Sequence, residues 1–456
     1  MTYRMVLAYD AGSSTMRIHQ SPHLCLAHFP GQDDRLSLPR YDVSSLNPGI
    51  LHIGMGAFHR AHQCTFFERL ANAGETSCGV FGVSLQSARV HDALERQDHL
   101  YSLTTLDGVE PVQVIGCIRQ SAGPDQLDQA LAFFGSAELK LVTLTVTEKA
   151  YDDPDTDMVR FLTEGIRRRA SVDLPLVVAS CDNLVGNGRR LQDLVLASLV
   201  DDPLVHSWVI ENVLFPNSMV DSITPRVTDD RLQKVEQYLG LVDEVPVQRE
   251  PFAQWVLEAC DLPFDLASAG VEIVPDVAPY ETLKLRILNA SHSLMAYAGP
   301  LLGHVSVREA VSDQLLAPVV ERFMHEMAGQ LELPATIDVE TYIQTTLTRF
   351  SNRGVEHHLL QIAEDGSSKL RERVVPVLSS ENDLPLLCLP IVFWVEFVRR
   401  RKAEGHPVID PLADTLSGEP GSMTSLLGLD DGSEVVRWFE VLRKHGIETF
   451  LGECIV

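Results

Sequence analysis

The sequence predicts an α/β fold, with a Rossmann-like doubly wound parallel sheet in the N-terminal part and a mostly α-helical C-terminal domain. Three observations favour this fold. A short apolar run at 49–53 leads through a glycine turn into a helical pattern, strand-length and helix-length patterns then alternate to residue 180, and helical patterns prevail from residue 279 onward. Such alternation is typical of a parallel sheet that is covered by helices on both faces.

The chain has 456 residues, which is enough for two domains with a substantial core each. We place a loosely structured N-terminal arm at 1–48, a dinucleotide-binding domain at 49–275 and a helical substrate-binding domain at 276–456. A formal net charge of −26 argues against nucleic acid and anionic membrane surfaces as partners. An anionic substrate would therefore need a local cluster of positive side chains.

The eight cysteines are scattered, with no C-x-x-C pair and no His/Cys spacing of a metal site. We therefore expect reduced thiols, no metal and a cytoplasmic protein. The first residues contain no apolar run long enough for a secretory signal. The most apolar stretch, 384–395, is interrupted by two prolines and is too short to span a membrane, so we expect it in the core.

The first strand, at 49–53, ends in the turn G-M-G-A-F-H-R-A-H-Q. Gly54 permits a tight turn, and Gly56 lets the backbone approach a pyrophosphate at the N-terminus of the next helix. The third glycine of the dinucleotide fingerprint is missing, because His59 holds its place. Taken alone, the pattern therefore also fits an ordinary strand-to-helix turn.

A second strand, at 78–85, leads into S-L-Q-S-A-R, with no acidic residue before Asp92. An acid at this place would bind the adenosine ribose and favour NAD over NADP. Arg89 either meets a 2′-phosphate or lies on the surface of the next helix. The residues by themselves leave the choice between NAD and NADP open.

Further strands are expected at 112–118, 139–146 and 174–180, with helices at 125–134 and 157–170. Ligands of such sheets lie beyond the carboxyl ends of the strands, and polar residues gather there. Asp182, Asn183 and Asn187 follow one strand, and F-P-N-S-M-V-D ends at Asp221. Asn and Asp are also common turn formers and helix caps, which is the alternative interpretation.

The helical domain opens with a helix at 279–299. With Lys284 at zero and 100° per residue, Glu281 lies at about 60°, His292 at about 80° and Asn289 at about 140°. Such a group suits alcohol and carbonyl chemistry, because a desolvated lysine loses its proton readily and amide and imidazole N–H groups can hold a developing oxyanion. A polar stripe beside a core face is the alternative.

Other helical patterns lie at 307–312, 315–331, 339–347, 353–364, 390–403 and 433–445. In D-G-S-S-K-L-R-E-R, Lys369, Arg371 and Arg373 would supply the positive cluster for an anionic substrate, although any of them could equally be solvated. His357 and His358 are neighbours, but adjacent residues on a helix point in different directions, so we predict no metal site. The cleft between the two domains is the expected ligand site.

The spacing K-x4-N-x2-H in K-L-R-I-L-N-A-S-H-S resembles the signature of the polyol-specific long-chain dehydrogenases. This is the family of mannitol dehydrogenase and of fructuronate reductase (D-mannonate oxidoreductase). Other segments are similar to the same family: the glycine turn, the C-D-N motif at 181–183, E-P-F-A-Q-W-V-L-E, and F-P-x-x-M-V-D, after which Ser222 replaces the usual Arg. The resemblance covers about residues 49–375.

The resemblance implies a role for each residue that matches the family's motifs. Lys284 would be the general acid/base, Asn183, Asn289 and His292 would bind the reacting oxygen, and Glu281 would be linked to proton exchange with solvent. The implied cofactor-binding residues are Gly54, Gly56, Ala57, Phe58, Arg60, Ser84 and Glu148. The implied substrate-binding residues are Asp221, Asn352, Lys369 and Arg371.

The resemblance further implies an NAD-dependent oxidoreductase of sugar metabolism that acts on a CH–OH group without a metal, with NADP not excluded. Fructuronate reductase, which interconverts D-mannonate and D-fructuronate, is the leading expectation, because V-S-L-Q-S resembles that branch. Mannitol 2-dehydrogenase and D-arabinitol 4-dehydrogenase are alternatives, and a nucleotide-binding regulator without turnover is a remote one. The expected partner is a small sugar acid or polyol, and the oligomeric state stays open.

Overall fold

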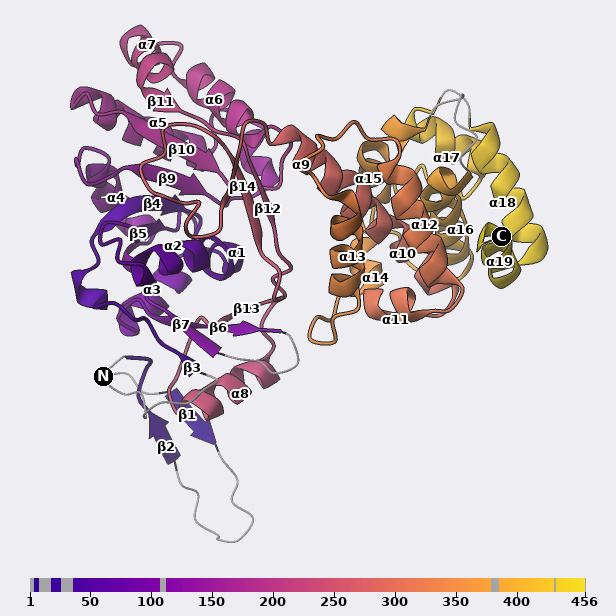
Figure 1. The fold of residues 1–456 in the computed structure, drawn as a ribbon, viewed down its shortest axis with the longest axis horizontal. Coiled ribbons are helices and arrows are strands. Elements are labelled where there is room, and N and C mark those ends of the chain that lie inside the picture. Colours follow the sequence, from indigo (N-terminus) through magenta and orange to yellow (C-terminus); the bar gives the residue numbers. More distant parts are fainter. Residues whose placement is uncertain are drawn as a thin grey trace. The chain divides into compact units, whose positions relative to one another are not determined.

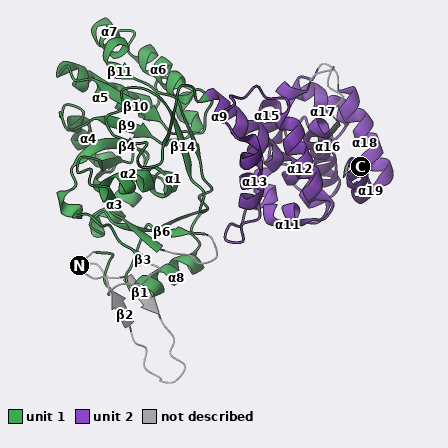
Figure 2. Ribbon diagram, viewed as in Figure 1, with its two compact units in different colours: residues 1–277 green, residues 278–456 purple. Residues whose placement is uncertain are grey.

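The computed structural model describes residues 4–7, 18–25, 36–106, 112–378, 385–429 and 432–455. The chain divides into two compact units, Met1–Val277 and Ala278–Val456, and each is described by itself (Figure 2). Within the described part of the chain, no helix is long and apolar enough to cross a membrane.

Unit 1 is built, over its described residues, around a six-stranded parallel sheet (Figure 1). Its strands are β4 (Pro48–Ile53), β5 (Gly79–Val83), β8 (Ile118–Ala122), β9 (Leu141–Leu144), β10 (Leu176–Ser180) and β11 (Val213–Leu214). They lie in the order β8-β5-β4-β9-β10-β11, and every neighbouring pair is parallel. This order runs outward from β4 in both directions, which is the doubly wound order and confirms the predicted fold class.

Helices connect these strands and pack on both faces of the sheet. They are α1 (Ala57–Ala61), α2 (Gln63–Asn72), α3 (Arg89–Arg96), α4 (Leu127–Phe133), α5 (Asp157–Ser171), α6 (Asn187–Ser198) and α7 (Pro203–Asn212). Alternate residues of β4 point to opposite faces, because Ile50 shares a hydrophobic core with Phe66 of α2 while Leu51 and Ile53 share another with Leu162 of α5. The apolar run that predicted this strand is therefore buried on both sides.

The strand predicted at 112–118 is divided between two sheets. Its first part is β7 (Val112–Ile115), which pairs antiparallel with β6 (Tyr101–Thr105), and β8 then begins at Ile118 in the main sheet. Between them, the N–H of Gly116 donates to the buried carboxylate of Glu68 at 3.0 Å. This non-local bond anchors the crossing from one sheet to the other, and a continuous apolar run carries no signal of it.

The segment 1–48, expected to be a loose arm, contributes to unit 1 in its described parts. β3 (Leu36–Ser37) pairs with β7 in a four-stranded sheet of order β13-β6-β7-β3, in which β13 is Val247–Arg249. Leu24 is fully buried in a small core with Leu239 of α8 (Asp229–Leu239). Two short strands, β1 (Arg4–Leu7) and β2 (Ile18–Ser21), pair with each other.

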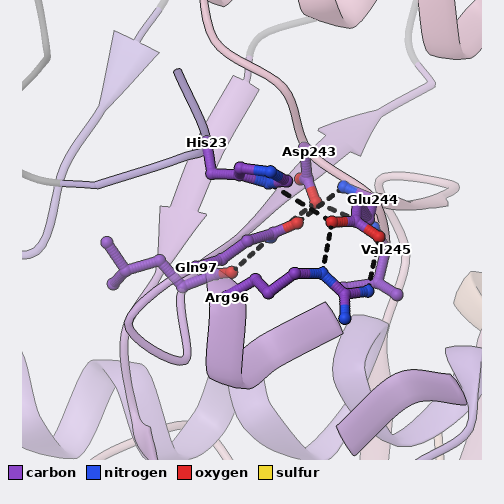
Figure 3. Close-up of polar contacts among 7 residues, drawn as sticks. His23, Arg96, Gln97, Asp243, Glu244 and Val245 are labelled. Atoms are coloured by element: carbon purple, nitrogen blue, oxygen red, sulfur yellow. Dashed lines mark hydrogen bonds and ion pairs between the residues drawn. The ribbon is translucent and has the colours of Figure 1, made fainter. Parts of the chain in front are cut away.

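Adjacent carboxylates tie three segments of unit 1 together (Figure 3). Asp243 accepts a hydrogen bond from the side chain of Gln97 at 3.0 Å, and Glu244 binds Arg96 through both oxygens, at 2.8 and 2.7 Å. The Nδ1 of His23 lies 3.3 Å from the Glu244 carboxylate. These contacts join the end of α3, the segment around His23 and the chain that leads into β13.

Unit 2 is helical over its described residues, as predicted. Its helices are α9 (Ala278–Leu283), α10 (Ala290–Leu301), α11 (Val307–Ser312), α12 (Leu316–Ala328), α13 (Val339–Phe350), α14 (Leu359–Ile362), α15 (Gly366–Arg373), α16 (Leu389–Ala403), α17 (Pro420–Leu427), α18 (Ser433–His445) and α19 (Ile447–Ile455). The core of this unit is built on α10 and α16, in which residues 290–299 and 389–398 are all buried. The apolar stretch expected in the core thus lies there in its described part.

The predicted helix at 353–364 is wrong in its first half. Only Leu359–Ile362 within it is helical, because the preceding residues bond elsewhere. The N–H of Gly354 donates to the Asn352 side chain at 2.8 Å, and the carbonyl of His357 accepts from the N–H of Val307 at 3.0 Å. Apolar spacing alone does not reveal such partners.

Candidate active site

A cavity of ≈ 790 Å³ lies in unit 1 at the carboxyl ends of β4, β5 and β9. Its walls are the segments that follow these strands, 54–56, 84–87 and 145–147. The sheet order reverses between β4 and β9, which is where doubly wound folds bind their ligands.

The two glycines of the turn after β4 give this cavity bare backbone. Gly54 has a φ of 101°, and a Cβ on it would lie 2.0 Å from the carbonyl oxygen of Thr145. Only glycine therefore lets β4 and the end of β9 approach so closely. Gly56 precedes α1, and a Cβ on it would find only the Gly54 oxygen, at 4.0 Å, so the space beside its backbone is open.

The other predicted nucleotide residues have different positions. Ser84 lines the cavity, whereas Ala57 is exposed at the start of α1. Phe58 stacks on His62, with ring centroids 4.9 Å apart. Glu148 is exposed, and the next residue, Lys149, lines the cavity instead. Sequence reasoning missed Lys149, although its place in the segment that follows β9 was the available signal.

The structure does not bring Arg60 to the cavity. Its guanidinium is buried and donates to the carbonyl of Met55 at 3.3 Å and to the carbonyl of Val245. It also lies over the ring of Tyr101, 5.4 Å from the centroid. Arg60 therefore ties α1 to the chain that enters β13.

The loop after β10 is held by a buried carboxyl. Asp182 accepts hydrogen bonds from the N–H of Val146 at 2.7 Å and from the hydroxyl of Tyr151 at 2.6 Å. Burial raises the pKa of Asp182 to about 7. The Asn187 amide donates to the carbonyl of Asp182 at 2.9 Å, so Asn187 braces the loop, while Asn183 is exposed on it.

Asp221 lies in a separate sheet of unit 1. It ends β12 (Ser218–Asp221), which pairs with β14 (Gln254–Glu258), and β14 pairs in turn with β15 (Glu272–Val274). The Asp221 side chain is buried. At the next position, where the family pattern has Arg, the Ser222 hydroxyl donates to the carbonyl of Phe252 at 2.9 Å.

In unit 2, the predicted helix at 279–299 contains a π-helical turn over Lys284–Asn289. Glu281 lies in α9 before this turn and is buried, and His292 lies in the first turn of α10 after it. In a π turn each N–H bonds five residues back, so residues five apart lie closer to one face than they do in an α-helix. The angles predicted for a regular α-helix are therefore wrong here, and Lys284 and Asn289 share one side more closely than expected.

His292 is buried against two rings of unit 2. Its ring centroid lies 4.5 Å from that of Phe350 and 5.0 Å from that of His357. Its Nε2 has no hydrogen-bond partner among the described residues. Burial lowers the pKa of His292 well below its ordinary value, and the imidazole of His357 and nearby positive side chains act in the same direction.

Three positive side chains lie close enough to His292 to act on its charge. They are Arg373, Arg349 and Lys369, and we call them with His357 the His292 cluster. Lys369 also donates to the carbonyl of Ile362 at 3.1 Å. The structure does not bring Arg371 to this cluster, because its guanidinium donates to the carbonyl of Leu426 on α17 at 2.6 Å.

Two members of the His292 cluster were not predicted as site residues. Arg349 is three residues before Asn352, which was the one residue predicted from the segment R-F-S-N at 349–352, and His357 was weighed only as a metal ligand. Asn352, which was predicted, lies just after α13. The described part of the chain holds no group of three His, Cys, Asp or Glu side chains that could bind a metal ion.

Comparison with known families gives two matches that together cover most of the chain. The profile of the mannitol dehydrogenase Rossmann domain matches residues 48–265. The profile of the mannitol dehydrogenase C-terminal domain matches residues 276–425.

Individual relatives show the same similarity. The mannitol 2-dehydrogenase of Phaeosphaeria nodorum is 33% identical over 430 residues, which cover 85% of this chain and 76% of that protein. The D-mannonate oxidoreductase of Escherichia coli is 32% identical over 419 residues, which cover 82% and 85%. A solved structure, Pseudomonas fluorescens mannitol 2-dehydrogenase with NAD and D-mannitol, is 29% identical and matches with a TM-score of 0.78 over 94% of this chain and 99% of that chain.

Proposed function

This chain belongs to the mannitol dehydrogenase family of oxidoreductases, and on that premise we propose that it interconverts D-mannonate and D-fructuronate with a nicotinamide cofactor. The family supplies the reaction class, oxidation of a secondary alcohol. The substrate is our inference from the His292 cluster. We further propose that the enzyme acts in the cytoplasm and without a metal.

One observation carries the choice of a sugar acid. Arg373 donates to the Asn289 carbonyl and the Ser293 hydroxyl, which flank His292 in the sequence, and Lys369 lies on the same helix, α15. Arg349 precedes Phe350, whose ring contacts His292, and the protein as a whole has a net charge of −26. A carboxylate is an effective partner for guanidinium and ammonium groups. A sugar acid therefore suits this cluster better than a neutral polyol does.

The residues of the unit 1 cavity fit a dinucleotide. Gly54 and Gly56 provide backbone without side chains before α1, and Ser84 and Lys149 also line the cavity. The relative solved with NAD and D-mannitol supports a nicotinamide cofactor. When bound, that group supplies the hydride acceptor for alcohol oxidation and the hydride donor for ketone reduction.

Residues of unit 2 can transfer the proton of the reacting hydroxyl group. In our proposal neutral Lys284 accepts the hydroxyl proton as the alcohol is oxidised, and protonated Lys284 returns it when the ketone is reduced. Asn289 and His292 hold the reacting oxygen. Burial lowers the pKa of His292 and keeps this imidazole neutral, so it can donate one hydrogen bond. Each such donor contributes on the order of 3 kcal/mol to the transition state.

Mannitol 2-dehydrogenase activity is the second candidate, because relatives of that name are equally similar. Initial rates on D-fructuronate, D-fructose and D-xylulose, each with NADH and then with NADPH, test the proposal. We expect D-fructuronate with NADH to give the highest kcat/KM. A higher value on fructose would replace the sugar acid with mannitol, and a higher value on xylulose would replace it with arabinitol. Cofactor binding without turnover on any of them would indicate a regulator.

A further inference from the structure

The end of α15 is joined to the π-helical turn by two arginines. From α15, the Arg373 Nη1 donates to the backbone carbonyl of Asn289 at 3.1 Å and to the hydroxyl of Ser293 at 3.2 Å. In the opposite direction, Arg286 of the π turn donates to the backbone carbonyl of Glu372. The two segments thus hold each other at neighbouring positions.

The carbonyl of Asn289 is a sensitive point of this helix. Asn289 ends the π turn and is also the residue before α10, so its carbonyl marks the change from π to α hydrogen bonding. The Ser293 hydroxyl donates to the same carbonyl at 3.3 Å. π turns are rare and need local support, since the regular α-helix competes with them. A charged N–H donor on this carbonyl, from Arg373, provides such support.

We propose that Arg373 is a positioning residue that holds the π turn, and thereby keeps Lys284 and Asn289 on one side of the helix. The inference rests on the proposed roles of Lys284 and Asn289. It differs from the expectation that Arg373 is only a ligand of an anionic substrate. Lys369 lies on α15 with Arg373. The contact of Arg373 therefore also links the helix that carries Lys369 to the π turn that carries Lys284.

The two roles of Arg373 predict different kinetics. A positioning residue acts on the chemical step, so Arg373→Met should lower kcat by about tenfold or more on D-fructuronate and on fructose alike, with little change in KM. A residue that only binds the carboxylate should raise KM for fructuronate and leave fructose unaffected.

Amide hydrogen exchange provides a readout that does not depend on turnover. We expect exchange in the peptide 284–293 to be about tenfold faster in Arg373→Met than in the unsubstituted enzyme. Arg371→Met is the matched control on the same helix, because its guanidinium contacts Leu426 on α17, and it should leave exchange in this peptide unchanged. Millimolar guanidinium should restore part of the kcat lost in Arg373→Ala.

These outcomes separate the inference from the proposed function. Turnover retained in Lys284→Ala would remove the role of Lys284 but would not alter the exchange result. Unchanged exchange in Arg373→Met, or a defect confined to KM for fructuronate, would overturn the positioning role. If Arg373→Met does not fold, Arg373→Lys keeps the charge and one donor, and it should show the same defects to a smaller degree.

Discussion

At the scale of single residues, the proposed chemistry depends on the charges near His292. The sequence has three positive side chains near residue 370. Two of them, Lys369 and Arg373, belong to the His292 cluster, together with Arg349 from α13. Arg371 faces α17 instead. On α15, Arg371 is rotated by about 200° from Lys369 and from Arg373, whereas Lys369 and Arg373 differ by only about 40°, so Arg371 points to another side of the helix.

Replacing Lys284 tests the proposed proton donor. We expect Lys284→Ala to lose most of kcat, by a factor of about 10³ or more, because the variant lacks the proposed proton acceptor. The affinity for NADH should change little, since the cavity of unit 1 is intact. Stopped-flow rates and NADH fluorescence titration measure the two quantities, with Lys234→Ala on the exposed face of α8 as the control. Retained turnover would remove the assignment.

Replacing Lys369 tests the sugar-acid substrate. A charged contact contributes about 1.5–3 kcal/mol, so Lys369→Met should raise KM for D-fructuronate by about tenfold to a hundredfold. Arg371→Met should change it less than about twofold, because the structure directs this side chain to Leu426. Steady-state kinetics of both variants on fructuronate decide the matter. An equal rise of KM in the two variants would indicate that Arg371 also binds the substrate.

At the scale of elements, the connection from β4 to α1 shapes the nucleotide cavity. Its first glycine is set against the end of β9, with φ of 101° and no room for a Cβ beside Thr145. Gly74, after α2, has φ of 102°, but a Cβ on it would meet nothing within 4 Å. The two glycines therefore share a backbone conformation and differ in crowding.

This difference allows a matched test of the turn. Gly74→Ala should cost only the left-handed backbone strain, about 1–2 kcal/mol of unfolding free energy. Gly54→Ala should cost more than that, because the carbonyl of Thr145 must also move, and it should weaken NADH binding. Urea unfolding and NADH titration measure both effects. Equal destabilisation, with NADH affinity preserved, would show that the close approach of β4 and β9 does not shape the cavity.

At the scale of the whole molecule, burial changes the ionisation of carboxyl groups as well as the packing of apolar side chains. Glu68 is fully buried, accepts from the Tyr41 hydroxyl at 2.9 Å and from the Gly116 N–H at 3.0 Å, and joins α2 to the crossing between two sheets. Burial raises the pKa of Glu68 to about 7. A net charge of −26 adds self-repulsion, so comparisons across pH need one ionic strength.

The raised pKa of Glu68 predicts a pH dependence of stability. Below about pH 4.5 the carboxyl is protonated in both states, and between about pH 4.5 and 7 it ionises in the unfolded chain first, so the unfolding free energy falls as pH rises. The loss is about 3 kcal/mol. Glu68→Gln should remove this part, so the difference in unfolding free energy between the variant and the unsubstituted protein should grow in favour of the variant from about pH 5 to about pH 8. A difference independent of pH would contradict the prediction.

The sequence by itself determined the backbone plan. Apolar runs and helical spacing are local signals, and they predicted the parallel sheet, the glycine turn at Gly54 and the helical unit from residue 279 onward. The motif K-x4-N-x2-H pointed to the family for the same reason, since it needs only neighbours in the chain.

Only the tertiary structure decided where the charged side chains of that plan point. Arg60 turned inward to a carbonyl 185 residues away, and Arg371 turned to one 55 residues away, so neither direction was visible in local spacing. The π turn at Lys284–Asn289 likewise has a partner from α15, in Arg373. Long side chains take the direction in which their donors find acceptors, and those acceptors are brought near only when the chain has folded.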